Sequence, residues 1–232
     1  MRKIFLILLL ICVVFNVAAQ INFYDEKEIN QLYYDFNLNE DILEYDAFYQ
    51  ALHGYNLINP ANKKYVCIID YTKSSKEKRF FVFDLVKKEI LYYTYVSHGR
   101  NSGNEYALNF SNETGSYKSS LGFFLTESTY QGRNGYSLVL NGLEKGINNN
   151  AKNRAIVIHG ANYVTSSKQF PLQRLGRSHG CPALAVSEAK EIIDRLKNGA
   201  LIYIYAQNAN YQRESSYVNS RFLRASVDFR LR

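Results

Sequence analysis

The stretch Ser178-His179-Gly180-Cys181-Pro182-Ala183-Leu184 places a cysteine between a flexible glycine and a helix-blocking proline, a position rarely used for packing. His179 lies two positions before Cys181, and His159, in the pair His159-Gly160, lies 22 positions upstream. Together these residues supply a nucleophile, a base to deprotonate it, and backbone N–H groups to receive developing negative charge. The stretch therefore predicts acyl-transfer chemistry at Cys181.

The chain around this motif has a mainly β pattern. Short runs rich in β-branched and aromatic residues are separated by polar, glycine-bearing turns. The predicted strands are 65–70, 79–85, 89–96, 122–126, 136–140, 154–158 and 201–205. One helix is predicted over 187–198, with Ser187 as its N-cap and Gly199 at its end. Cys181 is thus expected on a loop that follows a strand-ending histidine and precedes a helix.

The N-terminal part divides into two segments. Residues 1–19 begin with Arg2-Lys3, continue with an apolar run and end in small residues, as secretory signal peptides do. An uncleaved membrane anchor is the alternative, but a spanning helix needs about 20 apolar residues and this run is shorter. Residues 20–60 form a helical lead-in, because apolar residues recur there at spacings of three and four. We therefore expect an exported protein of the periplasm or cell envelope, with no stable membrane span after cleavage.

Residues 61–206 are then the expected catalytic domain, and 207–232 a basic polar C-terminal tail. Both a mobile terminus and an edge strand near 227–231 remain open for this tail. The aromatic content of 15%, including 20 Tyr, is enough for a substantial core. The net charge of +7 is spread through the chain, which suits an anionic polymer or surface and gives no nucleic-acid-binding pattern.

The remaining cysteine of the mature chain, Cys67, lies in the apolar run Tyr65-Val66-Cys67-Ile68-Ile69. A buried thiol there behaves as a small hydrophobe, so a core residue is favoured over a disulfide to Cys181. His98, in Ser97-His98-Gly99, is expected to be a turn or groove residue, because arginine follows where a nucleophile would stand. Zinc at Cys181, His159 and His179 would need a further ligand, for which only His98 is a ready candidate. We expect no metal and no cofactor.

The motif pair, Ile156-Val157-Ile158-His159-Gly160-Ala161 and the run from Gly176 to Leu184, resembles the murein L,D-transpeptidases with a YkuD-type catalytic domain. The branch with the motif S-H-G-C-P-A-L is the most similar. The resemblance covers about residues 60–206, and its further pieces are the stretches 97–103, 110–112, 119–124, 137–144 and 153–154. Two departures are Ala183, where many members have Arg or Asn, and Ser120, which takes the place of a hairpin proline.

This resemblance implies an L,D-transpeptidase-like β-sandwich domain and assigns roles to particular residues. Cys181 would be the nucleophile and His159 the general base, although His179 could exchange roles with His159. His179 and Gly180, with the Cys181 N–H, would form the oxyanion pocket. Gly160 and Ser178 would orient the imidazoles. Residues that flank the motif and could contact substrate carboxylates are Tyr163, Arg154 and Arg177.

The resemblance implies an exported cysteine L,D-transpeptidase acting on peptidoglycan stem peptides. The donor would be cut after its third residue with release of a D-residue, through a thioester acyl-enzyme. Two alternatives stay open: an L,D-carboxypeptidase or endopeptidase that uses water as the acceptor at the same site, and a non-catalytic cell-wall-binding module. Neither the acceptor nor the oligomeric state follows from the sequence.

Overall fold

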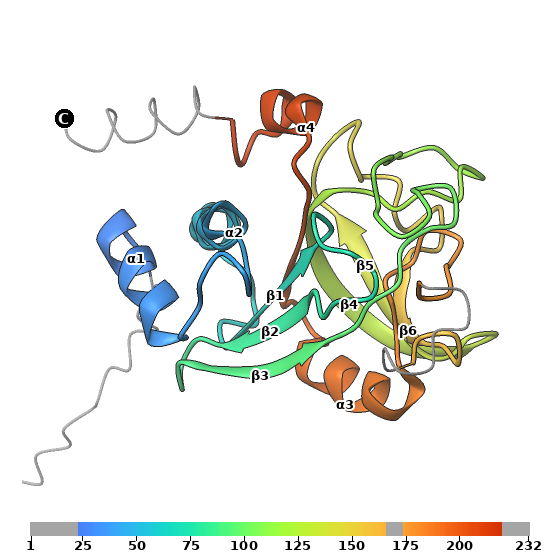
Figure 1. Cartoon of the computed structure of the whole chain (residues 1–232), viewed down its shortest axis with the longest axis horizontal. Coiled ribbons are helices and arrows are strands. Elements are labelled where there is room, and N and C mark those ends of the chain that lie inside the picture. The colour runs from blue at the N-terminus through green and yellow to red at the C-terminus, as the bar shows by residue number, and fades with distance from the viewer. Residues whose placement is uncertain (1–22, 166–173, 220–232) are drawn as a thin grey trace, which may run out of the picture.

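Residues 23–165 and 174–219 are described by the computed structural model (Figure 1). Eight strands belong to a single curled sheet in the order β3-β2-β1-β8-β4-β5-β6-β7. The strands are β1 (Tyr65–Asp70), β2 (Phe80–Asp84), β3 (Glu89–Thr94), β4 (Gly122–Gly132), β5 (Gly135–Gly142), β6 (Val157–Gly160), β7 (Ala183–Leu184) and β8 (Leu201–Tyr205). The prediction of a mainly β fold is confirmed. The sandwich detail is not, because hydrogen bonds connect all eight strands into one sheet.

The centre of the sheet is buried on both faces. Every residue of β1, β2 and β8 is buried, so these strands have nearly continuous apolar sequences rather than an alternating pattern. β1 pairs parallel with β8 and antiparallel with β2. Cys67 is fully buried in β1 with a free thiol, as predicted.

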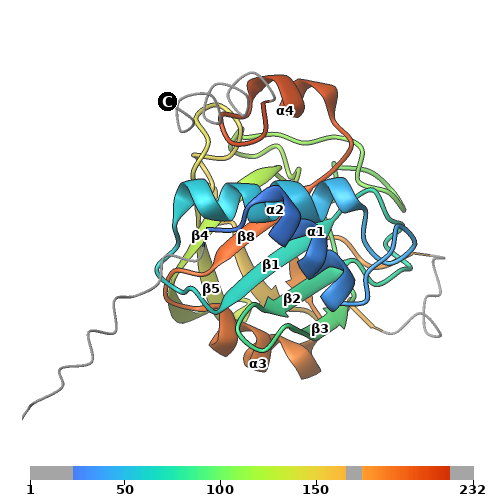
Figure 2. The same cartoon turned by 90° about the vertical axis from the view of Figure 1, so that its left-hand side faces the viewer.

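Helices α1 (Glu26–Asp35) and α2 (Tyr45–Ile58) cover one side of this centre. They lie together to the left of β1 and β2 in Figure 1 and in front of these strands in Figure 2. The ring of Phe83 on β2 lies 4.9 Å from that of Phe36 and 5.6 Å from that of Phe48, measured between centroids. Asp25 begins α1 with a reciprocal capping box to Glu28. The predicted helical lead-in is therefore a part of the core.

Helix α3 (Val186–Leu196) follows β7 and the loop 178–182, which is named the catalytic loop here after the role expected for Cys181, and α4 (Ala209–Glu214) follows β8. α3 begins one residue before the predicted N-cap: Ala185 occupies that position and makes no side-chain cap, so the prediction for Ser187 was wrong. The short α4 was not predicted. It is held by Tyr211 and Ser215, whose hydroxyls bond to the buried carboxylate of Glu144. The stretch 227–231 lies outside the described residues, and so do residues 1–22.

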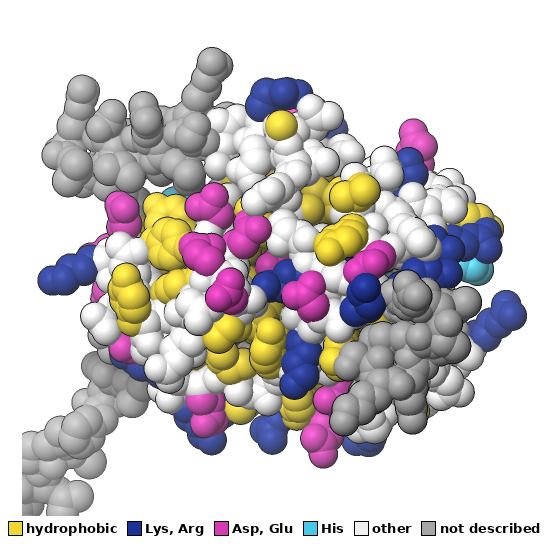
Figure 3. Space-filling view, viewed as in Figure 1, with side chains coloured by type: hydrophobic (Ala, Val, Ile, Leu, Met, Phe, Trp, Pro, Cys, Tyr) yellow, Lys and Arg dark blue, Asp and Glu magenta, His cyan; other side chains and the backbone are white. Residues whose placement is uncertain are grey.

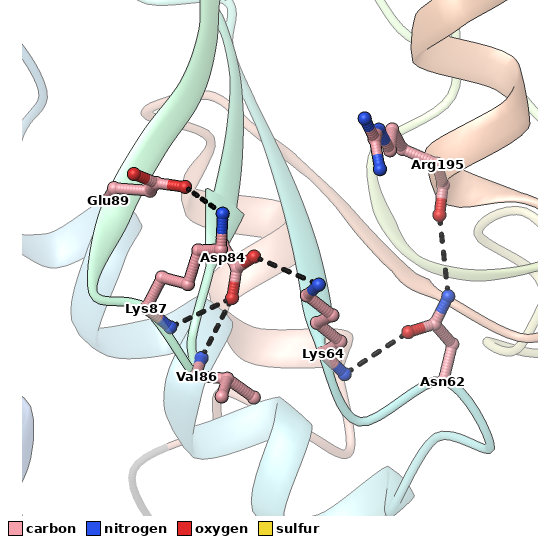
Figure 4. Close-up of polar contacts among 7 residues, drawn as sticks. All are labelled: Asn62, Lys64, Asp84, Val86, Lys87, Glu89 and Arg195. Atoms are coloured by element: carbon pink, nitrogen blue, oxygen red, sulfur yellow. Dashed lines mark hydrogen bonds and ion pairs between the residues drawn. The ribbon is translucent and has the colours of Figure 1, made fainter.

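The turn after β2 is organised by one buried carboxylate (Figure 4). Asp84 is 1% exposed and accepts hydrogen bonds from the backbone N–H groups of Val86 (3.0 Å) and Lys87 (2.9 Å). Its second oxygen pairs with Lys64 Nζ at 3.4 Å, which connects the turn to the start of β1. Short polar side chains that bond the backbone two residues ahead favour turns, so Asp84 fixes the β2–β3 connection. In the described parts of the chain, no helix is long and apolar enough to cross a membrane.

Candidate active site

The register of the sheet brings the two sequence motifs together. β6 pairs antiparallel with β5 through Ser137 and His159, and parallel with β7 through His159 and Ala183. Because Cys181 lies two residues before Ala183, its loop is fixed beside the strand that carries His159. The predicted strand at 154–158 is shifted to Val157–Gly160: Ala155 adopts a positive φ of 52°, which ends the preceding turn.

Cys181 and His159 line one open pocket of about 530 Å³. The other lining residues are Arg133, Asn134, Gly160, Ala161, Asn162, Tyr163, Arg177, Ser178 and His179. Of the site residues predicted from the sequence, Arg154 and Gly180 do not line this pocket. Arg133 and Asn134 were missed by the sequence analysis, although Gly132-Arg133-Asn134-Gly135 has the composition of a hairpin turn.

The catalytic loop is held by two serines. Ser178 Oγ donates to the carbonyl of Cys181 at 2.6 Å and accepts from the N–H of Gly180 at 3.0 Å. Ser119 Oγ donates to the carbonyl of Gly180 at 3.1 Å and accepts from the N–H of Gly99. The Gly180 N–H is therefore already used. Among the described residues, the Cys181 N–H donates to no other residue and lies within reach of its own Sγ, so it is the amide of this loop that can face a substrate oxyanion.

Gly180 is the position at which this loop requires a glycine. Its φ is +124°, a conformation that residues with a side chain rarely adopt. A Cβ atom there would lie 2.8 Å from the carbonyl oxygen of Lys118 and 3.0 Å from Cδ1 of Ile156. The glycine lets the loop pass against residue 118 while it turns the next amide toward the pocket.

The thiol of Cys181 is protonated in the resting state. Its residue is 8% exposed, and burial raises the pKa of the thiol; a backbone N–H and the Arg154 guanidinium act in the opposite direction without cancelling this effect. Sγ lies 3.5 Å from the carbonyl oxygen of Ala155, to which it donates its proton. Ionisation therefore needs a base that is close and neutral.

His159 has the protonation state of such a base. Burial lowers the pKa of its imidazole below the usual value, so it is neutral at pH 7. Nδ1 lies 2.9 Å from the carbonyl oxygen of Gly160, which can only accept a hydrogen bond. Nδ1 therefore carries the proton, and Nε2 has the lone pair that can take a proton from a thiol. This geometry favours His159 over His179 as the base.

His179 is exposed, lines the pocket and packs against the aromatic ring of Tyr117. Its imidazole centroid lies 4.6 Å from that of Tyr117, and the guanidinium carbon of Arg100 lies 4.0 Å from the same tyrosine ring. Tyr117 has a positive φ of 54°, which is uncommon for an aromatic residue. This tilted ring contact, with an interplanar angle of 55°, is what positions the His179 ring among the described residues.

The two arginines of the sequence-based set are occupied by the protein itself. Arg154 donates to the carbonyls of Ser111 and Lys118, both at 2.6 Å, and to the hydroxyl of Ser120. These bonds fix the segment 111–120 behind Gly180. One acceptor is Ser120, which stands where similar sequences have a hairpin proline. Arg177 lines the pocket, but its Nη1 donates to the carbonyls of Arg100 and Gly103.

A buried arginine, Arg79, and the side chains bound to it support the catalytic loop from the interior of the protein. Arg79 is fully buried, donates through Nη2 to Nδ1 of His98 at 2.8 Å, and lies with its guanidinium carbon 4.9 Å from the centre of the Tyr71 ring. Burial and this guanidinium lower the pKa of His98 to about 3, so its ring is neutral. The carbonyl of His98 accepts from the N–H of Ser178, and Tyr71 donates to the carbonyl of Ser97.

His98 is therefore a buried structural residue beneath the catalytic loop; it lies between the bridge residues Ser97 and Gly99 and does not line the pocket, so it is neither the turn nor the groove residue that was expected. Its ring bonds to Arg79 and lies 3.4 Å from the Gly103 carbonyl through Nε2. Of the residues the structure describes, none form a group of three or more His, Cys, Asp or Glu side chains that could hold a metal ion.

Comparison with known proteins extends these observations. Residues 39–205 match the L,D-transpeptidase catalytic domain family. Among solved structures, an L,D-transpeptidase from Mycobacterium smegmatis is 14% identical with a TM-score of 0.37, covering 62% of this chain and 59% of its own. An L,D-transpeptidase from Stackebrandtia nassauensis is 15% identical with a TM-score of 0.37 over 78% of each chain.

The helical cell shape determining protein Pgp2 from Campylobacter jejuni is 13% identical with a TM-score of 0.41, covering 64% of this chain and 50% of its own. The chain thus spans about three-fifths of the mycobacterial chain. No curated protein matches the sequence. These structural similarities are too distant to carry an argument about substrates. The family match covers well over half of the chain, includes both motifs and ends with β8, and so the chain belongs to the L,D-transpeptidase catalytic domain family.

Proposed function

We propose that this protein is a cysteine L,D-transpeptidase that acts on peptidoglycan stem peptides through a Cys181 thioester. The observation that carries the proposal is the neutral His159, which lines the same pocket as Cys181 with its Nδ1 bound to the Gly160 carbonyl. A neutral imidazole with a free Nε2 and a protonated thiol in the same pocket form the resting state from which nucleophilic catalysis at cysteine begins.

In the first half-reaction, Sγ leaves the Ala155 carbonyl and its proton passes to His159 Nε2. The thiolate attacks the carbonyl carbon of the donor amide, and the resulting oxyanion accepts the Cys181 N–H. Preorganised donors of this kind act strongly where water is excluded. When the C–N bond breaks, the imidazolium gives its proton to the departing amine. The D-residue is released, and the shortened stem remains bound to Sγ as a thioester.

In the second half-reaction, an acceptor amine attacks the thioester carbon. Nε2 of His159 takes the proton of the amine, the C–S bond breaks, and the proton returns to Sγ. The products are a new amide bond and the free thiol. Ser178 holds the Cys181 carbonyl in both steps, so the loop does not need to rearrange between them.

Export is part of the proposal. The leader sequence 1–19 has the charge and apolar pattern of a signal peptide, and members of this family act on the cell wall. We therefore place the protein outside the cytoplasm, in the periplasm or cell envelope.

The test uses the purified mature chain, residues 20–232, with a disaccharide tetrapeptide and an excess of amine acceptor, analysed by liquid chromatography and mass spectrometry. Release of the terminal D-residue together with a stem joined to the acceptor is the expected result. A tripeptide stem as the sole product would reassign the same site to hydrolysis. No turnover of any stem peptide would show that the proposed function is wrong.

The pH dependence follows from His159. The rate of acyl-enzyme formation requires neutral Nε2, and burial lowers the pKa of this imidazole below 6.5. The rate should therefore decline as the pH falls with a midpoint below 6.5, because the imidazole becomes half protonated only there. The measurement is the pH profile of the second-order acylation rate constant, which reports groups of the free enzyme. A decline with its midpoint above pH 7 would contradict the assignment.

A further inference from the structure

The tip of the β4–β5 hairpin reaches the pocket that holds Cys181. Gly132 pairs with Gly135, so Arg133 and Asn134 form the two-residue tip, and Gly135 has a positive φ of 75°. In the antiparallel pairing of β5 with β6, Ser137 lies opposite His159. Asn134 at the hairpin tip and Asn162, two residues after the end of β6, both line the pocket. Arg133 is thus held at the pocket by the same sheet that positions the base.

Among the described residues, the Asp, Glu, Lys and Arg positions of the pocket lining are all arginines, so its charge is positive. Arg133 and Arg177 contribute cationic groups, and among the described residues no Asp or Glu lines the pocket. Figure 3 shows Lys and Arg side chains grouped beside a His side chain at the right-hand edge, on the side of the molecule that carries β4 to β6. A lining of this kind attracts anionic groups and disfavours cationic ones.

The pocket-lining arginines differ in what they already bind. One nitrogen of Arg177 donates to two backbone carbonyls, of Arg100 at 2.9 Å and Gly103 at 2.7 Å. Arg154, behind the loop, is bound by the segment 111–120. Arg133 is exposed and, within the described residues, has neither an ion pair nor a hydrogen bond. Its fork of N–H donors is therefore available to a ligand in the pocket.

We propose that Arg133 is a specificity-determining residue that binds a carboxylate of the donor stem peptide. The inference rests on the proposed function, since it names the substrate group that the same site recognises. A guanidinium matches a carboxylate with two parallel N–H···O bonds, a geometry that neither an amide nor an ammonium group reproduces. Arg133 in this role orients the donor while Cys181 attacks it.

The experiment compares two donors, a stem peptide with its carboxylates free and the same peptide with them amidated, in the wild-type protein, Arg133→Gln and Arg133→Lys. The wild type should prefer the free acid. Arg133→Gln should lower kcat/KM for the free acid about tenfold, mainly through KM, because a charged hydrogen-bond pair is lost. The amidated donor should change less than about twofold, and Arg133→Lys should restore part of the preference.

The matched control is Arg213→Gln, which removes the same charge from the exposed face of α4, outside the pocket. It should leave both donors unaffected. Equal losses for the two donors in Arg133→Gln, or no loss for either, would overturn the role of Arg133 while leaving the proposed function intact. A wild-type protein that turns over neither donor would instead remove the proposed function and this inference with it.

Discussion

Replacing Cys181 by alanine is expected to abolish acyl-enzyme formation. The variant lacks the only sulfur that lines the pocket in the described part of the chain, and the Ser178 hydroxyl, which also lines it, is already bound to the Cys181 carbonyl. Removal of a covalent nucleophile typically costs about 10⁴-fold or more in turnover. Intact-protein mass spectrometry after incubation with a stem peptide or a carbapenem should show no mass increase for the variant and one adduct for the wild type.

Cys67→Ala is the matched control for that experiment. Cys67 is a fully buried thiol in β1, and burial raises its pKa well above the usual value, so it is neither accessible nor ionised. The variant should form the same adduct as the wild type, at a similar rate, even if the small cavity lowers its melting temperature. An adduct on the Cys181→Ala protein would refute the assignment of the nucleophile.

Gly180→Ala should produce the second large effect. The new Cβ would lie 2.8 Å from the Lys118 carbonyl oxygen, at a φ of +124° that alanine rarely adopts. The loop must shift, which moves the adjacent Cys181 N–H away from the oxyanion. Loss of one such donor lowers the rate about 10²- to 10³-fold. The acylation rate constant should fall by this factor, and the added strain of about 1–3 kcal/mol should lower the melting temperature.

The variant Gly146→Ala separates the effect of a displaced Cys181 N–H from the effect of backbone strain. Gly146 also has a positive φ, +81°, but a Cβ there would meet nothing within 4 Å, and the residue does not line the pocket. Its substitution should cost stability through backbone strain alone and leave acylation unchanged. If Gly180→Ala acylated as fast as Gly146→Ala, the catalytic loop would not need the conformation that glycine permits.

Several parts of the fold could be read from the residues alone. β1 and β8 occur at the predicted bounds, 65–70 and 201–205, because fully buried strands leave continuous apolar runs. β7 was missed, since it has two residues and is defined only by its pairing with His159 and Gly160. α4 was missed for a related reason: it is six residues long and depends on the distant carboxylate of Glu144.

For the candidate site too, some properties could be predicted from the sequence and others only from the structure. Residue types and spacing were enough to select Cys181 and His159, because a cysteine between glycine and proline with histidines nearby has few structural uses. Spacing did not favour either histidine as the base, whereas the bond between Nδ1 and the Gly160 carbonyl favours His159 for the proposed role. The structural role of Arg154 and the role proposed for Arg133 were equally hidden, because only the structure shows that Arg154 is bound by the segment 111–120 and that Arg133 lines the pocket.

The amino-acid sequence by itself therefore predicted the family and the mainly β character, which are confirmed, and proposed Cys181 as the nucleophile, because these depend on local chemistry and on runs of apolar residues. The tertiary structure decided which proton lies where, which amide of the catalytic loop stays unbonded, and which arginine can reach a ligand. Those properties arise from contacts between segments far apart in the chain, such as Ser119 with Gly180 and β5 with β6. No local sequence pattern encodes such contacts, because the two residues of each contact lie far apart along the chain.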